Sequence, residues 1–190
     1  MIDLDDPYAL LFAAVDELTR AGLEHAVYGG LALAVYGEPR ETKDADLAVA
    51  NLSIEAVRLA LEQIGATVVV AFTNTQFGGL LISRLTLLGG GKLNMVDLVK
   101  PRSERYASLA LSRTLRGELE GHDIRVMAPE DFVLFKVLST REKDVEDARS
   151  VLASVGDELD RQLIEAEVAL LAAEIPSHDI SGRWHRVTAT

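Results

Sequence analysis

The fold is decided by the stretch AVYGGLALAVYGEPRETKDADLAVA, residues 26–50. Residues 25–28 are mostly apolar and favour a β-strand that ends at the glycine pair Gly29 and Gly30. The next residues have helical spacing up to about Tyr36. The stretch therefore predicts a strand that turns abruptly into a short helix, followed by a second strand over residues 46–50.

Two aspartates stand at the start of the second strand. In a strand, side chains two residues apart point to the same face, so Asp44 and Asp46 project together while Ala45 and Leu47 face the other way. Carboxylates held that close repel one another unless a cation or strong donors lie between them. Mg²⁺, which binds carboxylate oxygens together with substrate phosphates, is the cation expected here. Taken alone, the pair is more typical of an exposed strand end.

The glycine pair adds a second chemical feature. A strand that ends in Gly29 and Gly30 and passes directly into a helix exposes backbone amides at the positive helix end. A phosphate can approach there because no Cβ atoms stand in the way. The simpler interpretation is a tight strand-to-helix turn without a ligand.

A third aspartate interrupts a later strand. Asp97 lies in the apolar stretch KLNMVDLV, residues 92–99, where a charge is costly unless it is paired. If this strand lies beside the one that carries Asp44 and Asp46, three carboxylates converge. Such a group can hold two metal ions that bridge a triphosphate and an attacking hydroxyl. Asp97 is then expected nearest the acceptor hydroxyl, where it binds the second metal and helps to remove the proton.

Length and composition limit the classes of protein. With 190 residues, 48% of them hydrophobic, the chain can bury one sizeable core. No apolar run approaches the roughly 20 residues that cross a bilayer, and the start is acidic, so a cytoplasmic protein is expected. The chain has no cysteine, which excludes disulfides and thiolate zinc sites. A net charge of −11 argues against broad non-specific binding to duplex nucleic acid.

The pattern along the chain predicts an α/β (α+β) fold, a mixed β-sheet flanked by helices, with a short helical C-terminal part. The α/β core is expected over residues 1–127 and the helical extension, packed on the core, over 128–190. Pro101 is expected to open a helix that runs to about Arg113. The third strand is expected over residues 67–72, and the end of the chain, with Trp184, is expected to form a docked tail. The other expected elements are helices at 7–20, 53–64, 129–139, 143–154 and 157–173, and strands at 80–88, 92–99, 115–119 and 123–127.

These residues resemble the polymerase-beta-like nucleotidyltransferase superfamily, whose signature is a glycine followed by glycine or serine, an acid-x-acid pair, and a third acid on a later strand. Within it, the chain is most similar to the bacterial abortive-infection type, which includes toxins of toxin-antitoxin pairs. The resemblance covers about residues 26–150. The matching positions are Gly29, Gly30, Arg40, Thr42, Asp44, Asp46, Asp97, Lys136 in PEDFVLFKVL, and KDVED at 143–147.

The resemblance implies a nucleotidyltransferase fold and two Mg²⁺ ions per site. It also implies that Lys136 reaches the triphosphate; the alternative is that this lysine extends to solvent from its apolar surroundings. Asp144 and Asp147 are candidates to orient Lys136 or Arg40, or are acids favoured by the helix dipole. Gly30 replaces the serine of many members, so the backbone must bind the phosphate without a hydroxyl.

The predicted reaction is transfer of a nucleoside monophosphate from a nucleoside triphosphate to a hydroxyl, with release of pyrophosphate. The expected acceptor is an RNA end, such as that of tRNA, and the expected protein partner is a cognate antitoxin. A local basic cluster would guide the RNA backbone. Its members are Lys100, Arg102, Arg105, Arg113 and Arg116.

Two alternatives stay open. The same chemistry could modify a small cationic molecule such as an aminoglycoside, which acidic residues on the acceptor side of the cleft would favour. The chain could instead be a catalytically silent protein that binds a nucleotide or a partner. The three aspartates count against the silent alternative, because a protein without catalysis has no physical need for crowded carboxylates.

Overall fold

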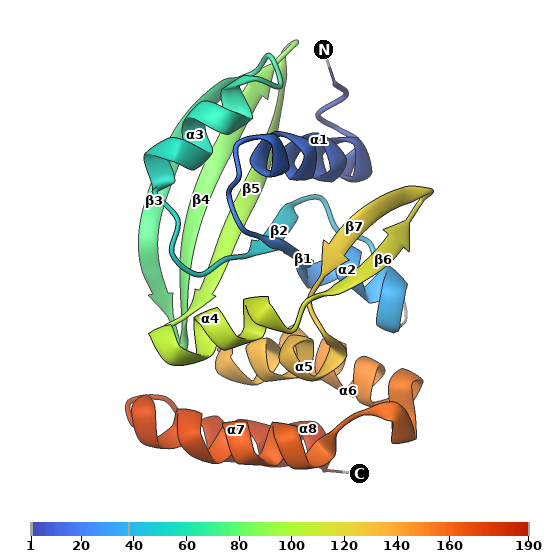
Figure 1. Cartoon of the computed structure of the whole chain (residues 1–190), viewed down its shortest axis with the longest axis vertical. Coiled ribbons are helices and arrows are strands. Elements are labelled where there is room, and N and C mark those ends of the chain that lie inside the picture. Colours follow the sequence, from blue (N-terminus) through green and yellow to red (C-terminus); the bar gives the residue numbers. More distant parts are fainter. Residues whose placement is uncertain (1, 38, 190) are drawn as a thin grey trace.

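The computed structural model describes residues 2–37 and 39–189. Its strands are β1 (Ala26–Tyr28), β2 (Ala45–Ala48), β3 (Thr67–Phe77), β4 (Leu80–Gly89), β5 (Lys92–Pro101), β6 (Leu115–Leu119) and β7 (His122–Val126). They form a seven-stranded mixed sheet in the order β3-β4-β5-β2-β1-β7-β6 (Figure 1). The expected α+β fold is confirmed.

The helices alternate with strands in the first half of the chain and follow one another in the second half. They are α1 (Pro7–Arg20), α2 (Gly29–Tyr36), α3 (Ile54–Glu62), α4 (Glu104–Ser112), α5 (Pro129–Leu138), α6 (Glu142–Val155), α7 (Arg161–Glu174) and α8 (Ile180–Thr188). Within the part of the chain that the structure describes, no helix has the length and apolar character that crossing a bilayer requires.

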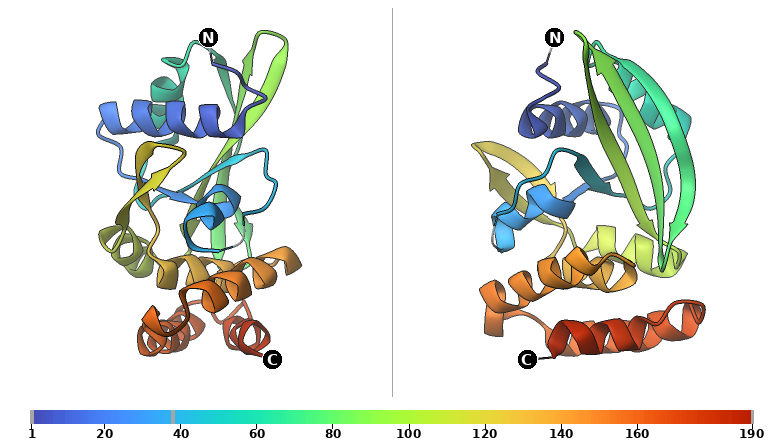
Figure 2. Two further views of the ribbon diagram at one scale, coloured as in Figure 1. Left: turned by 90° about the vertical axis from the view of Figure 1, so that its right-hand side faces the viewer. Right: turned by 180° about the vertical axis from the view of Figure 1, so that it is seen from behind.

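The sheet separates two groups of helices. Helices α1 and α3 lie against one face, and α2 and α5 lie on the opposite side (Figures 1 and 2). Leu47 on β2 and Leu98 on β5 pair in register and are buried on the α1 side. Helices α7 and α8 form a further layer that packs against α5 and α6. The two neighbours of Leu47 and Leu98 in sequence, Asp46 and Asp97, therefore face the α5 side.

The strand register follows from tight turns. Strands β4 and β5 form an antiparallel hairpin through Gly90 and Gly91, which have φ values of +59° and +76°. Glycine suits this turn because other residues rarely adopt positive φ. The same hairpin fixes which β4 residue lies opposite each β5 residue, and β5 then pairs in parallel with β2.

The structure corrects four expected element boundaries. Pro101 ends β5 and does not open a helix; α4 begins at Glu104, because the Ser103 side chain accepts a hydrogen bond from the Tyr106 amide and caps the helix. Strand β3 continues to Phe77, because it pairs along the whole of β4. Helix α7 begins at Arg161 and not at 157, since a 3-10 turn precedes it. The expected tail forms helix α8, whose Trp184 is buried.

Candidate active site

A row of polar side chains crosses the centre of the sheet. Asp46 on β2 pairs with Tyr28 on β1 and with Asp97 on β5, and Asp97 pairs with Arg84 on β4. Residues paired across strands point to the same face. The structure thus places Asp97 directly beside Asp46, on the strand next to β2. Asp44, two residues before Asp46, lies directly before β2 and contacts the same arginine.

Arg84 contacts two of the three aspartates. Its Nε donates to Asp97 Oδ1 at 2.7 Å, and its Nη2 donates to Asp97 Oδ2 at 2.7 Å. The same Nη2 lies 3.5 Å from Asp44 Oδ2. This two-pronged hydrogen bonding raises the pKa of Arg84 further above its usual range. Sequence reasoning missed this residue, although it is the one charge within the apolar stretch LLISRLTLL, residues 80–88.

Asp46 lies in an environment that disfavours its charge. Burial raises its pKa to about 6, and the neighbouring carboxylates Asp97 and, less strongly, Asp44 act in the same direction. Lys136 and Arg141 oppose this shift without cancelling it. Close carboxylates of this kind are stabilised when a cation or an electropositive ligand binds among them.

The glycine turn lies against the row of aspartates. Gly29 has a φ of +72°, and a Cβ atom at this position would lie 2.0 Å from Asp46 Oδ2. A Cβ atom on Gly30 would lie 2.9 Å from Thr42 Cβ and 3.1 Å from the Arg40 guanidinium carbon. Both glycines are thus needed because polar side chains of the following segment lie directly over the turn. The turn, Asp46 and Arg40 form one contiguous surface.

We expect Gly29→Ala to lower the free energy of unfolding by about 3 kcal/mol, from about 1–2 kcal/mol of positive-φ strain plus a steric term of similar size. The steric term arises because Asp46 must move away from the new methyl group. Urea denaturation measures the loss. Gly91→Ala is the matched control, since Gly91 also has a positive φ but has open space around the added methyl group. Equal losses in the two variants would show that Asp46 does not constrain the turn.

Lys136 lies in a buried cluster of charges beneath the turn. Its fully buried ammonium donates to Asp144 Oδ1 and to Asp147 Oδ2, both at 2.8 Å. Asp147 also accepts from Arg40 Nε at 3.0 Å. Burial by itself would raise the pKa of Asp144, but Lys136 and Arg141 outweigh it and lower this pKa to about 2. Direct contact between Lys136 and a triphosphate stays a prediction.

Asp147 joins this cluster to the glycine turn. It pairs with Lys136 on one side and, through both oxygens, with Arg40 on the other. The Arg40 side chain is partly exposed, with its guanidinium beside Gly30. Arg40 is thus an accessible cation next to the turn, and Lys136 and Asp147 support it from the interior.

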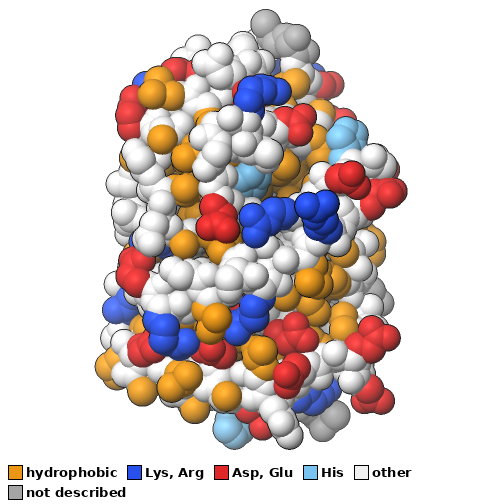
Figure 3. Space-filling model, viewed as in Figure 1, with side chains coloured by type: hydrophobic (Ala, Val, Ile, Leu, Met, Phe, Trp, Pro, Cys, Tyr) orange, Lys and Arg blue, Asp and Glu red, His pale blue; other side chains and the backbone are white. Residues whose placement is uncertain are grey.

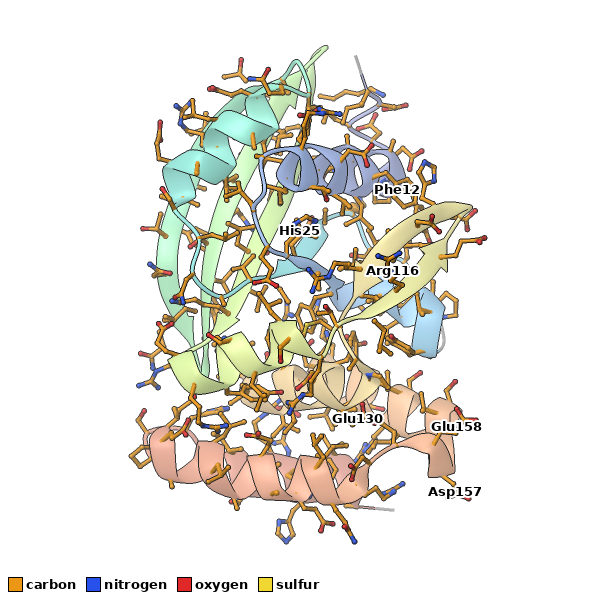
Figure 4. All side chains as sticks on the ribbon, in the orientation of Figure 1. Phe12, His25, Arg116, Glu130, Asp157 and Glu158 are labelled. Carbon is orange, nitrogen blue, oxygen red and sulfur yellow. The ribbon has the colours of Figure 1, made fainter. Side chains whose placement is uncertain are left out.

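The expected basic cluster does not form one patch. Arg105 pairs with Glu167 and Glu174 of α7, and Arg113 pairs with Asp131 of α5. On the face shown in Figure 3, lysine and arginine side chains lie among aspartates and glutamates. The remaining three members are also dispersed. Lys100 pairs with Glu104, Arg102 donates to Gly78 O and Ser177 Oγ, and Arg116 lies apart on β6 (Figure 4).

Two hollows adjoin Asp44. One, of about 440 Å³, is lined by residues that include Asp5, Glu41, Lys43 and Asn94. The other, of about 410 Å³, is lined by Arg40, Glu41, Thr42, Lys43, Asp44 and Lys143. The loop before β2 separates them and contributes to both. Asp44 therefore lines both hollows, together with Asp5 in the first and with Arg40 and Lys143 in the second.

The three aspartates suit a hard divalent cation chemically, because Mg²⁺ prefers carboxylate oxygens. Burial raises the pKa of Asp46, and repulsion from Asp97 and Asp44 adds to the shift, so a cation placed there would relieve that repulsion. Among residues 2–37 and 39–189, however, no three His, Cys, Asp or Glu side chains already surround a single point. Arg84 supplies the positive charge at Asp44 and Asp97.

A family model described as "Nucleotidyl transferase of unknown function (DUF2204)" matches residues 9–186. The protein therefore belongs to this nucleotidyl transferase family. The superfamily expected from the sequence is confirmed, while the abortive-infection branch stays a prediction. No curated protein gives a significant match to the chain.

Two solved structures share the fold at low sequence identity. A candidate nucleotidyltransferase from H. pylori has a TM-score of 0.52 and 12% identity, over 95% of this chain and 89% of that one. ANT(2")-Ia, solved in complex with adenylyl-2"-tobramycin, has a TM-score of 0.50 and 16% identity, over 88% of this chain and 95% of that one. Both likenesses concern the fold alone.

Proposed function

We propose that the protein transfers a nucleoside monophosphate from a nucleoside triphosphate to a hydroxyl group and releases pyrophosphate. The observation that carries this proposal is the pairing of Asp46 with Asp97 beside the Gly29 turn, with Asp44 bound to the same Arg84 as Asp97. Catalysis of this kind depends on positioning and on neutralisation of phosphate charge. A catalytically silent protein is less well supported, because the buried and crowded carboxylate of Asp46 lowers the stability of the folded state when no ligand is bound.

The three aspartates are the proposed metal ligands. Asp44, Asp46 and Asp97 would hold Mg²⁺, two ions per site, and Asp97 would lie nearest the acceptor hydroxyl. When bound, the metal would neutralise phosphate charge and favour loss of the hydroxyl proton.

The glycine turn and its neighbouring cation would bind the triphosphate. Gly29 and Gly30 are buried beneath Asp46, Thr42 and Arg40, so phosphate would reach their backbone once these side chains move aside, and Arg40 would contact it as a partly exposed guanidinium. Asp147, which pairs with Lys136, would hold Arg40 in place, and Lys136 would contribute positive charge from beneath.

For the acceptor, we propose a small cationic molecule. Three carboxylates and one cation, Lys43, line the hollow of about 440 Å³: Glu41, Asp5, which pairs with Lys92, and Asp44, which pairs with Arg84. Carboxylates in the wall of a hollow disfavour a polyanion and can bind a cation. The RNA end stays a prediction that rests on family resemblance, because the arginines expected to guide RNA are engaged in other contacts. The toxin role and the antitoxin partner are likewise predictions from the resemblance.

The test is a transfer assay with nucleoside triphosphates labelled at the α-phosphate, Mg²⁺, and either an aminoglycoside or total RNA as acceptor. We expect label to be transferred to the aminoglycoside, together with pyrophosphate release, and to be lost in Asp46→Asn. Labelling of RNA alone would contradict the proposed acceptor but retain the reaction. Pyrophosphate release unaffected by Asp46→Asn would contradict the assignment of the site.

The stability of the metal-free protein should depend on the charge of Asp46. Its pKa of about 6 lies above the ordinary 3.8, so between these values the folded state binds more protons than the unfolded state. The cost of the buried charge is therefore full above about pH 6 and is relieved as the pH falls toward 4. At pH 7.5–8, roughly, we expect Asp46→Asn to be more stable than the wild type by about 1–3 kcal/mol.

Urea denaturation of both proteins in EDTA measures this difference across the pH range. The stability gap should narrow below about pH 6, because the wild-type carboxyl then becomes neutral like the asparagine. A gap that is absent or reversed at neutral pH would mean that the crowding of Asp46 is already compensated by its neighbours.

A further inference from the structure

Among the residues that the structure describes, Arg84 is the one cation whose side chain is hydrogen-bonded to the proposed metal ligands Asp97 and Asp44. Lys136 and Arg40 are held by Asp147, and Arg141 is held by Asp144. Arg84, in contrast, contacts Asp97 through two hydrogen bonds and Asp44 through a longer one. Any divalent cation that binds Asp44 and Asp97 must therefore share or replace the contacts of this guanidinium.

The burial of Asp97 favours the Arg84 guanidinium as its partner in the free protein. Asp97 is 95% buried, so an unpaired carboxylate there would be costly. Arg84 satisfies both of its oxygens at 2.7 Å. The Arg84 side chain can turn toward solvent because it is 29% exposed. Its guanidinium carbon lies 5.8 Å from the centre of the Phe72 ring on β3. A planar guanidinium can pair with a phosphate as readily as with a carboxylate.

We propose that Arg84 is the resident counter-cation of the carboxylate row and competes with divalent metal for Asp97 and Asp44. This inference rests on the proposed function, since it concerns the same site. A divalent cation alone binds weakly, because it must displace the guanidinium. A nucleoside triphosphate brings phosphate oxygens with which the displaced Arg84 can pair, so metal and nucleotide bind together. Arg84 is accordingly a substrate-positioning residue that lies outside the motif positions named from the sequence.

The test is calorimetric titration of Mn²⁺ into the nucleotide-free protein at about pH 8, where carboxyl groups of ordinary pKa are ionised. We expect Arg84→Gln to bind Mn²⁺ about tenfold more tightly than the wild type, the effect of one lost competing ion pair. Arg84→Lys, which keeps the charge but loses the two-pronged geometry, should lie between them. The control is Arg58→Gln on α3, where Arg58 pairs only with Glu55 and Glu62 and lies outside the row; its Mn²⁺ affinity should equal that of the wild type.

A second readout concerns the coupling between metal and nucleotide. A non-hydrolysable nucleoside triphosphate should tighten Mn²⁺ binding more in the wild type than in Arg84→Gln. Because Arg84→Gln leaves Asp97 without its partner, the variant is expected to unfold at a lower temperature, and Mn²⁺ should then raise its melting temperature more than that of the wild type. The rise in melting temperature that Mn²⁺ causes can be compared between the two proteins even if Arg84→Gln is less stable without metal.

The outcomes separate this inference from the proposed function. Mn²⁺ affinity that is unchanged or weakened in Arg84→Gln, with clear binding by the wild type, would overturn the competition and leave the metal site intact. Absence of Mn²⁺ binding and of Mn²⁺ stabilisation in every variant, with or without nucleotide, would overturn both. Tighter binding in Arg84→Gln, lost again in Arg84→Gln combined with Asp97→Asn, is the result that supports the proposal.

Discussion

Asp97→Asn is expected to reduce the rate of nucleotidyl transfer by about a thousandfold. Asparagine has nearly the same shape but no charge, so it removes a proposed metal ligand without opening a cavity. Loss of about 4 kcal/mol of transition-state stabilisation, the scale of a metal contact to a reacting oxygen, corresponds to a rate loss of this size. The measurement is pyrophosphate release at saturating nucleoside triphosphate.

The expected loss should appear mainly in kcat, because Asp97 is proposed to act at the acceptor hydroxyl and not in nucleotide binding. Asp16→Asn is the matched control, since Asp16 is exposed on α1 and outside the row. A reduction of less than about tenfold in Asp97→Asn would be too small for a metal ligand, since tenfold corresponds to only 1.4 kcal/mol. Asp97 would then be a partner of Arg84 with no part in the chemistry.

Lys136→Met is expected to lower the free energy of unfolding by about 3–5 kcal/mol, the usual result of removing one partner from a buried ion pair. Methionine fills a similar volume but leaves two buried carboxylates, Asp144 and Asp147, with less positive charge. The ammonium also lies 4.9 Å from the centre of the Tyr28 ring, a favourable cation–π contact that methionine would weaken. Guanidinium chloride denaturation measures the change.

The control for this variant is Lys143→Met, an exposed lysine at the start of the same helix that carries Asp144 and Asp147. Its substitution should change stability by less than about 0.5 kcal/mol. If Lys136→Met were as stable as the control, the buried cluster would be energetically replaceable. Lys136 could then be retained for contact with the nucleotide, as the resemblance implies.

Local sequence patterns predicted most of the elements because each has a local cause. The apolar spacing of residues 7–20 predicts α1, and Ser53 caps α3 through its hydroxyl. The glycine pair predicts the turn from β1 into α2, and the φ of Gly29 explains why the first of the two must be glycine. Asp46 and Asp97 each interrupt an apolar strand, which predicts a polar site, and the parallel pairing of β2 with β5 places these two side by side.

The missed features depend on contacts between distant parts of the chain. Arg84 lies opposite Asp97 because the β4-β5 hairpin turns at Gly90 and Gly91. The sequence has three consecutive glycines, residues 89–91, and the pairing of the two strands depends on which of them form the turn. The basic cluster appeared accessible because its partners, Asp131, Glu167 and Glu174, lie in helices that come later in the chain. The helical form of α8 was missed because its short pattern is weak without the α6 and α7 surfaces that cover it.

The boundary expected near residue 127 stays a prediction, and the contacts across it are informative. Lys136 and Asp147 belong to the helical part, but they hold Arg40, which belongs to the loop before β2. Phe132 and Phe135 of α5 also pack against Tyr28 of β1. The helical part thus completes the phosphate-binding side of the proposed site.

The central claim is that the carboxylate row binds nucleoside triphosphate together with a divalent metal. The most direct measurement is a thermal-shift titration of each nucleoside triphosphate, with and without Mg²⁺, on the wild type and on Asp46→Asn. We predict a rise in melting temperature that requires Mg²⁺ and disappears in Asp46→Asn, because a ligand that binds only the folded state stabilises it. No shift in the wild type at millimolar nucleotide, or an equal shift in both proteins, would contradict the claim.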